Sequence, residues 1–210
     1  MTTHSHEDNI VEATNRVEAF SDGVYAVLLT LLILDLRVPV VAIMNSREFV
    51  AALMHVWPTF VAFTFSFFTI AIFWVNHHHF FHNIERTDWK LLWYNNVHLF
   101  FIALIPFATA FIGKYYTSVV PVALYAIVLM FGGLSMMLMI RYVLFHSNLL
   151  YSGFSESKKK SEFKRGMIGV YLYVVAAAAA FVQVYIAIAI LVATPILFVV
   201  PGLLSGEERK

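Results

Sequence analysis

The sequence predicts an all-α integral membrane protein with six transmembrane helices in a single domain, residues 1–210. Of these 210 residues, 60% are apolar and only 13% are charged, whereas soluble domains average about 45–50% apolar and about 25% charged. Several segments longer than 20 residues contain no Asp, Glu, Lys or Arg, and about 20 such residues suffice for one helix to cross a bilayer. This composition excludes ordinary soluble enzymes and nucleic-acid-binding proteins.

The first expected span is unusual because its opening turns are acidic. Glu18 and Asp22 precede an uncharged and mostly apolar run from Val24 to Leu34. Placing an acidic side chain inside a membrane helix costs free energy, so such a residue indicates a role in function or assembly. The other five spans follow from the uncharged runs in chain order, which gives the set 17–36, 49–76, 90–113, 118–141, 165–183 and 186–204.

The last uncharged run is long enough for two spans. Gly166 to Gly206 contains 41 residues without a formal charge, which is about 61 Å of helix against about 30 Å of hydrocarbon. The run must fold back, and we expect the turn near Gln183, beside its most polar residues. Pro121 falls in the first turn of the fourth span, where proline is tolerated. Pro106 and Pro195 are expected to kink the third and sixth spans.

Loop charges predict the orientation of the chain. With six spans, both termini and the loops 77–90 and 141–165 share one side and carry 11 of the 14 Lys and Arg residues, and the other side carries 3. Basic residues accumulate on the cytoplasmic side of membrane proteins. We therefore expect a multi-pass protein of the cell membrane with both termini in the cytoplasm.

One face of the first span carries a stripe of apolar side chains. Val27, Leu31 and Leu34 recur at helical spacing with Thr30 beside them. Asp22 lies about 140° around the helix from Val27, since successive residues advance by about 100°. Asp22 is therefore expected to face away from the stripe. Periodicity alone favours ordinary packing of this face over a functional surface.

Histidines gather at the end of the second span. His78 and His82 are four residues apart, a spacing that can hold a metal ion on one helix face. This raises the alternative of a membrane metal enzyme of the hydroxylase or desaturase type, with His77, His78, His79 and His82 as ligands. No Asp or Glu lies between Glu48 and Glu85 to complete such a site. We assign no catalytic residue, metal ligand or cofactor.

The other interpretation of these histidines is a polar belt at the cytoplasmic interface, paired with Asp22, Asn76 or Asn83. Asn95, Asn96 and His98 of the third span are expected to form hydrogen bonds between helices, as buried polar groups in membranes do. A secondary transporter is a further alternative, although no inverted repeat is visible in the sequence.

The segment from Arg16 to Leu36 resembles the first-helix signature of the transmembrane protein 175 family of potassium channels. The matching positions are Arg16, Phe20, Ser21, Asp22, Gly23, Ala26, Thr30, Leu31 and Leu32, with Val27 where isoleucine or leucine is usual. The resemblance continues in residues 74–79, 86–95 and 105–107 and extends over the whole chain in length and span order.

The resemblance implies a potassium-selective cation leak channel of modest selectivity. The chain holds one six-helix unit, which is similar to the bacterial form, in which four chains surround a single pore lined by the first helix of each subunit. Its partners would be three further copies of itself, membrane lipid and permeant monovalent cations, with potassium as the permeant ion and no cofactor.

The resemblance also assigns residues to roles. Side chains of the first helix form the constriction in place of a carbonyl filter, and the matching positions are Val27, Thr30, Leu31 and Leu34. The Phe-Ser-Asp-Gly motif serves mainly as a packing network. The residues assigned to that network are Arg16, Phe20, Ser21, Asp22, Gly23, His77, His78 and His79.

Overall fold

The structure is a computed structural model, and it describes residues 4–41, 45–150 and 156–199. Over these ranges it is built from helices without a β-strand, apart from a single bridge between Ile84 and Leu150. Five helices are long and apolar enough to cross a membrane, and a shorter apolar helix follows them. The prediction of an all-α membrane protein is confirmed.

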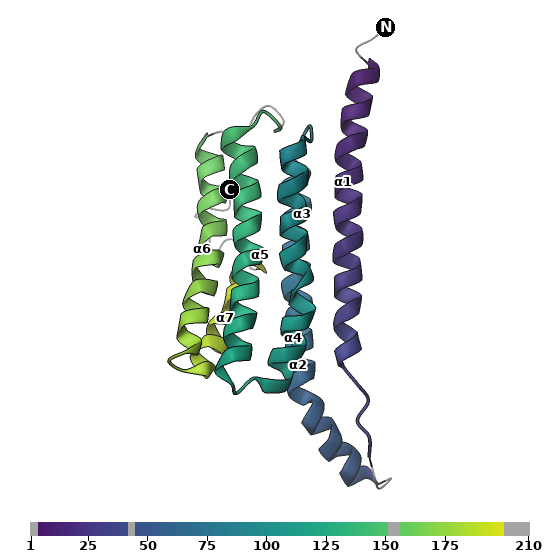
Figure 1. Ribbon diagram of the computed structural model, residues 1–210, viewed down its shortest axis with the longest axis vertical. Coiled ribbons are helices and arrows are strands. Elements are labelled where there is room, and N and C mark those ends of the chain that lie inside the picture. The colour runs from purple at the N-terminus through teal and green to yellow at the C-terminus, as the bar shows by residue number, and fades with distance from the viewer. Residues whose placement is uncertain (1–3, 42–44, 151–155, 200–210) are drawn as a thin grey trace, which may run out of the picture.

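The helices follow one another with short connections (Figure 1). Their bounds are α1 His4–Leu31, the 3₁₀ helix η1 Leu32–Asp35, α2 Ser46–Phe81, α3 Trp89–Ala103, α4 Ile105–Tyr115, α5 Val119–His146, α6 Glu156–Ala180 and α7 Val184–Val199. The predicted span 186–204 overlaps α7, and its last residues, 200–204, lie outside the described residues. The predicted turn near Gln183 falls between α6 and α7, where Oε1 of Gln183 accepts a hydrogen bond from the amide of Tyr185.

Local chemistry explains where several helices begin. Asn45 caps α2 by accepting the amide of Glu48 at 2.9 Å, and Asp88 caps α3 by accepting the amide of Leu91 at 2.8 Å. Each cap satisfies a backbone donor that has no partner inside its helix. These caps place the helix starts on polar residues at the edges of the apolar runs.

Prolines interrupt two of the long helical segments. The predicted span 90–113 is divided at Leu104 into α3 and α4, and Pro106 lies in the first turn of α4, so the interruption coincides with the expected kink. In Figure 1 the N-terminal part of α2 is inclined to the rest of that helix. Pro58 lies inside α2 and explains the bend, because proline lacks the amide hydrogen that would continue the helical ladder.

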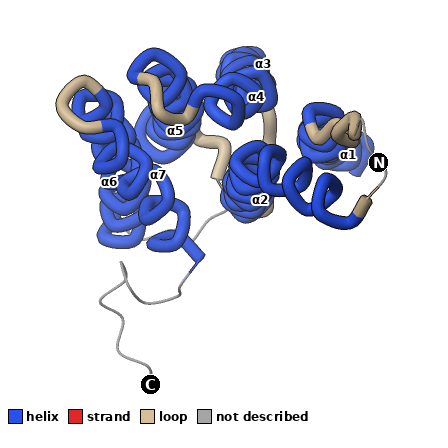
Figure 2. The backbone as a smooth tube through the Cα atoms, turned by 90° about the horizontal axis from the view of Figure 1, so that it is seen from below, coloured by secondary structure: helices blue, strands red, loops and turns tan. Residues whose placement is uncertain are grey.

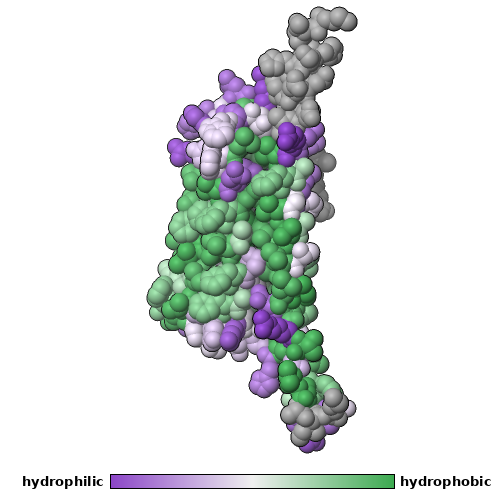
Figure 3. All heavy atoms as spheres, turned by 45° about the vertical axis from the view of Figure 1, so that its right-hand side comes forward, coloured by the Kyte–Doolittle hydropathy of each residue, from purple (hydrophilic) through white to green (hydrophobic). Residues whose placement is uncertain are grey.

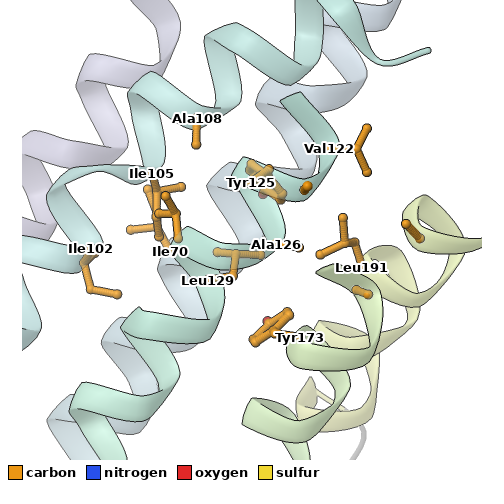
Figure 4. Close-up of a cluster of buried hydrophobic side chains, with 14 of the residues drawn as sticks. Ile70, Ile102, Ile105, Ala108, Val122, Tyr125, Ala126, Leu129, Tyr173 and Leu191 are labelled. Carbon is orange, nitrogen blue, oxygen red and sulfur yellow. The ribbon is translucent and has the colours of Figure 1, made fainter. Parts of the chain in front are cut away.

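The helices form a body with α1 at one edge and the α6–α7 hairpin at the other (Figures 1 and 2). The principal buried cluster joins α2, α3, α4, α5 and the α6–α7 hairpin around Ile70, Ile102, Leu129 and Leu191 (Figure 4). On the face shown in Figure 3, apolar residues form a broad band between more hydrophilic ends. The inner face of α1 joins the buried cluster, and none of the described residues covers its outer face.

The α1 face and the polar network behind it

The two faces of α1 differ sharply in exposure. On the outer face, the exposed fractions are 55% for Val27, 41% for Leu31 and 66% for Leu34, whereas Leu28 on the inner face is only 5% exposed and Leu32 is buried. Leu34 belongs to η1, and a 3₁₀ helix has three residues per turn. Leu34 therefore stays on the same face as Leu31. The predicted stripe forms a continuous apolar surface that no other part of the described chain covers.

Thr30 contributes a polar group to this apolar face. Its hydroxyl donates a hydrogen bond to the carbonyl of Val27 at 2.8 Å and is exposed. A hydroxyl has one donor and two acceptor lone pairs, so donation to the backbone leaves the oxygen lone pairs free to point outward. The α1 face thus combines apolar side chains with an oxygen that is suited to contact a cation.

Behind this face, a buried hydrogen-bond network begins at Ser21. Ser21 Oγ donates to the carbonyl of Val17 at 2.9 Å and accepts from Nδ2 of Asn95 on α3 at 3.0 Å. Oδ1 of Asn95 lies 2.8 Å from Nε2 of His77 on α2. Because this amide oxygen only accepts, Nε2 of His77 is the donor. Three helices are joined through the single side chain of Asn95.

A second branch runs from Tyr25 through His98 to α5. Nδ1 of His98 lies 3.1 Å from the carbonyl oxygen of Gly132, and a carbonyl can only accept, so Nδ1 carries the proton. Nε2 of His98 then accepts from the hydroxyl of Tyr25 at 2.7 Å. The rings of His77 and His98 stack at 5.9 Å and bring the two branches together. The hydrogen bonds expected of Asn95 and His98 are present, whereas Asn96 is exposed and takes no part in the network.

Asp22 lies on the side of α1 that faces α2. Its Oδ1 accepts a hydrogen bond from Nε1 of Trp74 at 2.8 Å, and Nδ1 of the neighbouring His78 lies 2.9 Å from Oε1 of Glu18. The sequence predicted a histidine partner for Asp22, so the indole donor of Trp74 is a correction. In the sequence, a tryptophan on an apolar helix indicates a packing residue. Its role as a hydrogen-bond donor to Asp22 follows only from the way α1 packs against α2.

Other predicted residues take no part in these contacts. Arg16 and Phe20 are exposed, and a Cβ added at Gly23 would meet nothing within 4 Å. His79 and His82 are also exposed, and no hydrogen bond joins Asp22, Asn76 or Asn83 to the ring of any described histidine. The sequence-based prediction omitted the donors Tyr25 and Trp74, which bond His98 and Asp22. It also omitted Ser135, whose hydroxyl lies 3.1 Å from Nδ1 of His98. Tyr25 could have been found, because it lies one turn from Ser21 on the inner face of α1.

A cavity of about 300 Å³ lies between α2, α5, α6 and α7. Its lining is mostly apolar and includes His79, Asn76 and Arg165. Of the four histidines proposed as enzyme ligands, only His79 borders it. The described residues therefore do not gather the predicted histidine ligands around this cavity.

Long apolar helices, an exposed α1 face that carries the hydroxyl of Thr30, and a polar network between helices define an integral membrane protein of the channel class. The sequence model of the family described as "Endosomal/lysosomal potassium channel TMEM175" matches residues 16–106. The chain is also 34% identical over 190 residues to a potassium channel of Chryseobacterium sp. (strain P1-3), which covers 89% of this chain and 92% of that protein. The chain belongs to the TMEM175 family.

Other similarities agree with this assignment. A potassium channel of Chamaesiphon minutus is 41% identical over 102 residues, about half of each chain. The human endosomal/lysosomal proton channel TMEM175 is 39% identical over 99 residues, which are 44% of this chain and 20% of that protein.

A solved structure supports the fold as well. The crystal structure of a lysosomal potassium-selective channel TMEM175 homolog from Chamaesiphon minutus has a TM-score of 0.79 and 29% identity. The similarity covers 89% of this chain and 96% of that one. These relatives are named as channels, so the chain is a channel-family protein and not an enzyme.

Proposed function

We propose that four copies of this chain form a potassium-selective cation leak channel of modest selectivity, with α1 of each copy lining the pore. The observation that carries the proposal is the outer face of α1, where Val27, Leu31 and Leu34 are exposed while Leu28 is buried. Two relatives from bacteria are named as potassium channels. A fourfold arrangement with α1 at its centre covers this face with copies of itself.

Thr30 favours a pore over a lipid-facing surface. Lipid tails offer nothing to a hydroxyl oxygen, whereas a cation that has lost part of its water shell gains a ligand from it. The hydroxyl proton of Thr30 is already donated to the backbone of α1, so four such residues would present a ring of oxygen lone pairs to the axis. This ring is the proposed source of ion preference.

The surrounding leucines would act as the constriction. The carbonyls of a helix are engaged in its own hydrogen-bond ladder, so they cannot surround an ion as they do in a carbonyl filter. Rings of Leu31 and Leu34 offer no ligand, and a narrow apolar ring excludes water and ions. Conduction therefore requires a wider ring through which a partly hydrated ion passes. Selectivity would be modest because potassium gives up its water only somewhat more readily than sodium.

The proposed placement in the membrane follows from charge. With both termini in the cytoplasm, 11 Lys and Arg residues lie on the inner side of the cell membrane and 3 on the outer side. In this orientation, Ser21 and Asp22 lie nearer the cytoplasmic end of α1 than Leu34 does.

The proposal is tested on the purified full-length chain in planar bilayers with potassium on one side and sodium on the other. We expect unitary currents whose reversal potential favours potassium, and a tetramer by native mass spectrometry. Solute-coupled transport without unitary currents would favour the transporter alternative and overturn the channel proposal. A monomer that remains monomeric in bilayers would overturn the tetramer.

A further inference from the structure

Two carboxylates and an imidazole meet where α1 passes α2. Glu18 and Asp22 are four residues apart on α1, and His78 comes from α2. One potential ligand atom from each of the three residues lies within 4.8 Å of the other two. Side chains from two helices are thus gathered closely enough for small side-chain rotations to bring all three around one metal ion.

The charges of this cluster are not balanced within the described residues. Like charges four residues apart on a helix repel each other, and none of the described Lys or Arg residues forms an ion pair with Glu18 or Asp22. His78 is the one member of this cluster that can become positive, and a single imidazolium cannot neutralise two carboxylates. The cluster therefore favours a divalent cation.

The position of the His78 ring nitrogen adds to this argument. Its Nδ1 is shielded from solvent and lies 2.9 Å from Oε1 of Glu18, but it makes no hydrogen bond of normal geometry. A buried nitrogen that faces a carboxylate oxygen without a well-directed hydrogen bond is arranged like one of two ligands around a shared cation. The His78 side chain as a whole is 46% exposed, so water can reach the cluster and complete the coordination.

We propose that Glu18, Asp22 and His78 bind one divalent transition-metal ion, for which Zn²⁺ is the probe. One imidazole and two carboxylates suit zinc and its first-row neighbours, whereas Mg²⁺ and Ca²⁺ prefer ligand sets made only of oxygen. This set differs from the histidine group suggested by the sequence, because only His78 is common to both.

Trp74 would act as a positioning residue for the site. Its Nε1 donates to Oδ1 of Asp22 at 2.8 Å, which leaves Oδ2 free for the metal. Its ring also stacks on His78 at 5.8 Å. Hydrogen bonds to metal ligands of this kind fix their orientation. A bound metal would join α1 to α2 near the C-terminal end of α2. This holds whether or not the outer face of α1 lines a pore.

The experiment measures Zn²⁺ binding to the full-length chain in detergent by titration calorimetry, after treatment with a chelator and removal of any affinity tag. The parent and all variants carry His4→Ala and His6→Ala, because these N-terminal histidines are potential ligands themselves. We expect one Zn²⁺ per chain and little heat with Mg²⁺. His78→Ala and Glu18→Gln should each lower Zn²⁺ affinity by roughly tenfold or more.

The matched control is His79→Ala, which removes an exposed histidine beside the site and should leave affinity unchanged. Size-exclusion chromatography selects the variants that fold. If His78→Ala does not fold, the near-isosteric Glu18→Gln provides the test. Equal affinities for the parent and Glu18→Gln, or an equal loss in His79→Ala, would overturn the site. The measurement involves no current, so the metal site and the channel proposal succeed or fail separately.

Discussion

The hydroxyl of Tyr25 lies 2.7 Å from Nε2 of His98, and this contact holds the proposed pore helix against the body of the protein. His98 in turn donates a hydrogen bond from Nδ1 to the carbonyl oxygen of Gly132 on α5. Both side chains are buried, so neither group has water as a substitute partner. The orientation of α1, and with it the direction of its outer face, depends on this bond.

Tyr25→Phe should therefore destabilise the protein. The substitution leaves Nε2 of His98 buried without a donor, and an unsatisfied buried polar group costs about 1–3 kcal/mol. We expect a lower midpoint of thermal unfolding in detergent. Tyr171→Phe, at an exposed position on α6, removes the same hydroxyl and should change the midpoint little. Equal shifts in both variants would show that the Tyr25–His98 bond does not hold α1 in place.

Asp22 and Trp74 should act as a unit in assembly. Asp22→Ala and Trp74→Phe each remove one partner of the same interhelical hydrogen bond. Each is expected to lower tetramer yield, and the double variant should be hardly worse than either single variant. The coupling free energy should lie between about 0.5 and 3 kcal/mol, as for residues in contact.

The measurement for this pair is the tetramer fraction by size-exclusion chromatography, together with the reversal potential of whatever channels form. Asp22→Asn keeps a side-chain oxygen that can accept the hydrogen bond from Trp74. Its tetramer fraction should therefore fall less than that of Asp22→Ala. Normal assembly with altered ion preference in Asp22→Ala would place Asp22 in the pore and contradict this assignment.

The parts of the site that could be predicted are those set by helical period or by the need to satisfy buried polar groups. The period separates Leu28 from Leu31, and their exposures follow it. Buried amides and imidazoles in a membrane need hydrogen-bond partners, so the sequence predicts that Asn95 and His98 bond to other helices without identifying the partners. The partner itself depends on how two helices meet, which no local pattern contains. For this reason the Trp74–Asp22 bond and the pairing of Glu18 with His78 were not predicted.

Polar substitutions on the outer face of α1 should act on conduction. Leu31→Ser and Leu34→Ser add four hydroxyl groups to a narrow ring, which lets water enter where leucine excludes it. We expect a larger unitary current and a weaker preference for potassium, measured in planar bilayers. These effects rest on the proposed position of both residues at the pore axis.

Leu28→Ser is the control for this series. Leu28 is buried against the body, so the same change should cost about 2–5 kcal/mol of stability through lost packing. The remaining folded channels should keep the unitary current of the parent. If Leu28→Ser and Leu31→Ser alter conduction equally, the outer face of α1 is a packing surface and does not line a pore.

Thr30→Val tests the source of ion preference most directly. Valine keeps the shape of threonine but replaces the hydroxyl with a methyl group, so a permeating ion loses an oxygen that offsets its lost water. The reversal potential under a potassium–sodium gradient should move towards zero while the tetramer forms as before. Thr64→Val on α2 is the matched control, because Thr64 also donates its hydroxyl to its own helix, at the carbonyl of Phe60. Thr64 lies away from the proposed axis and should leave selectivity unchanged. An unaltered reversal potential in Thr30→Val would mean that ion preference arises from a different ring of side chains.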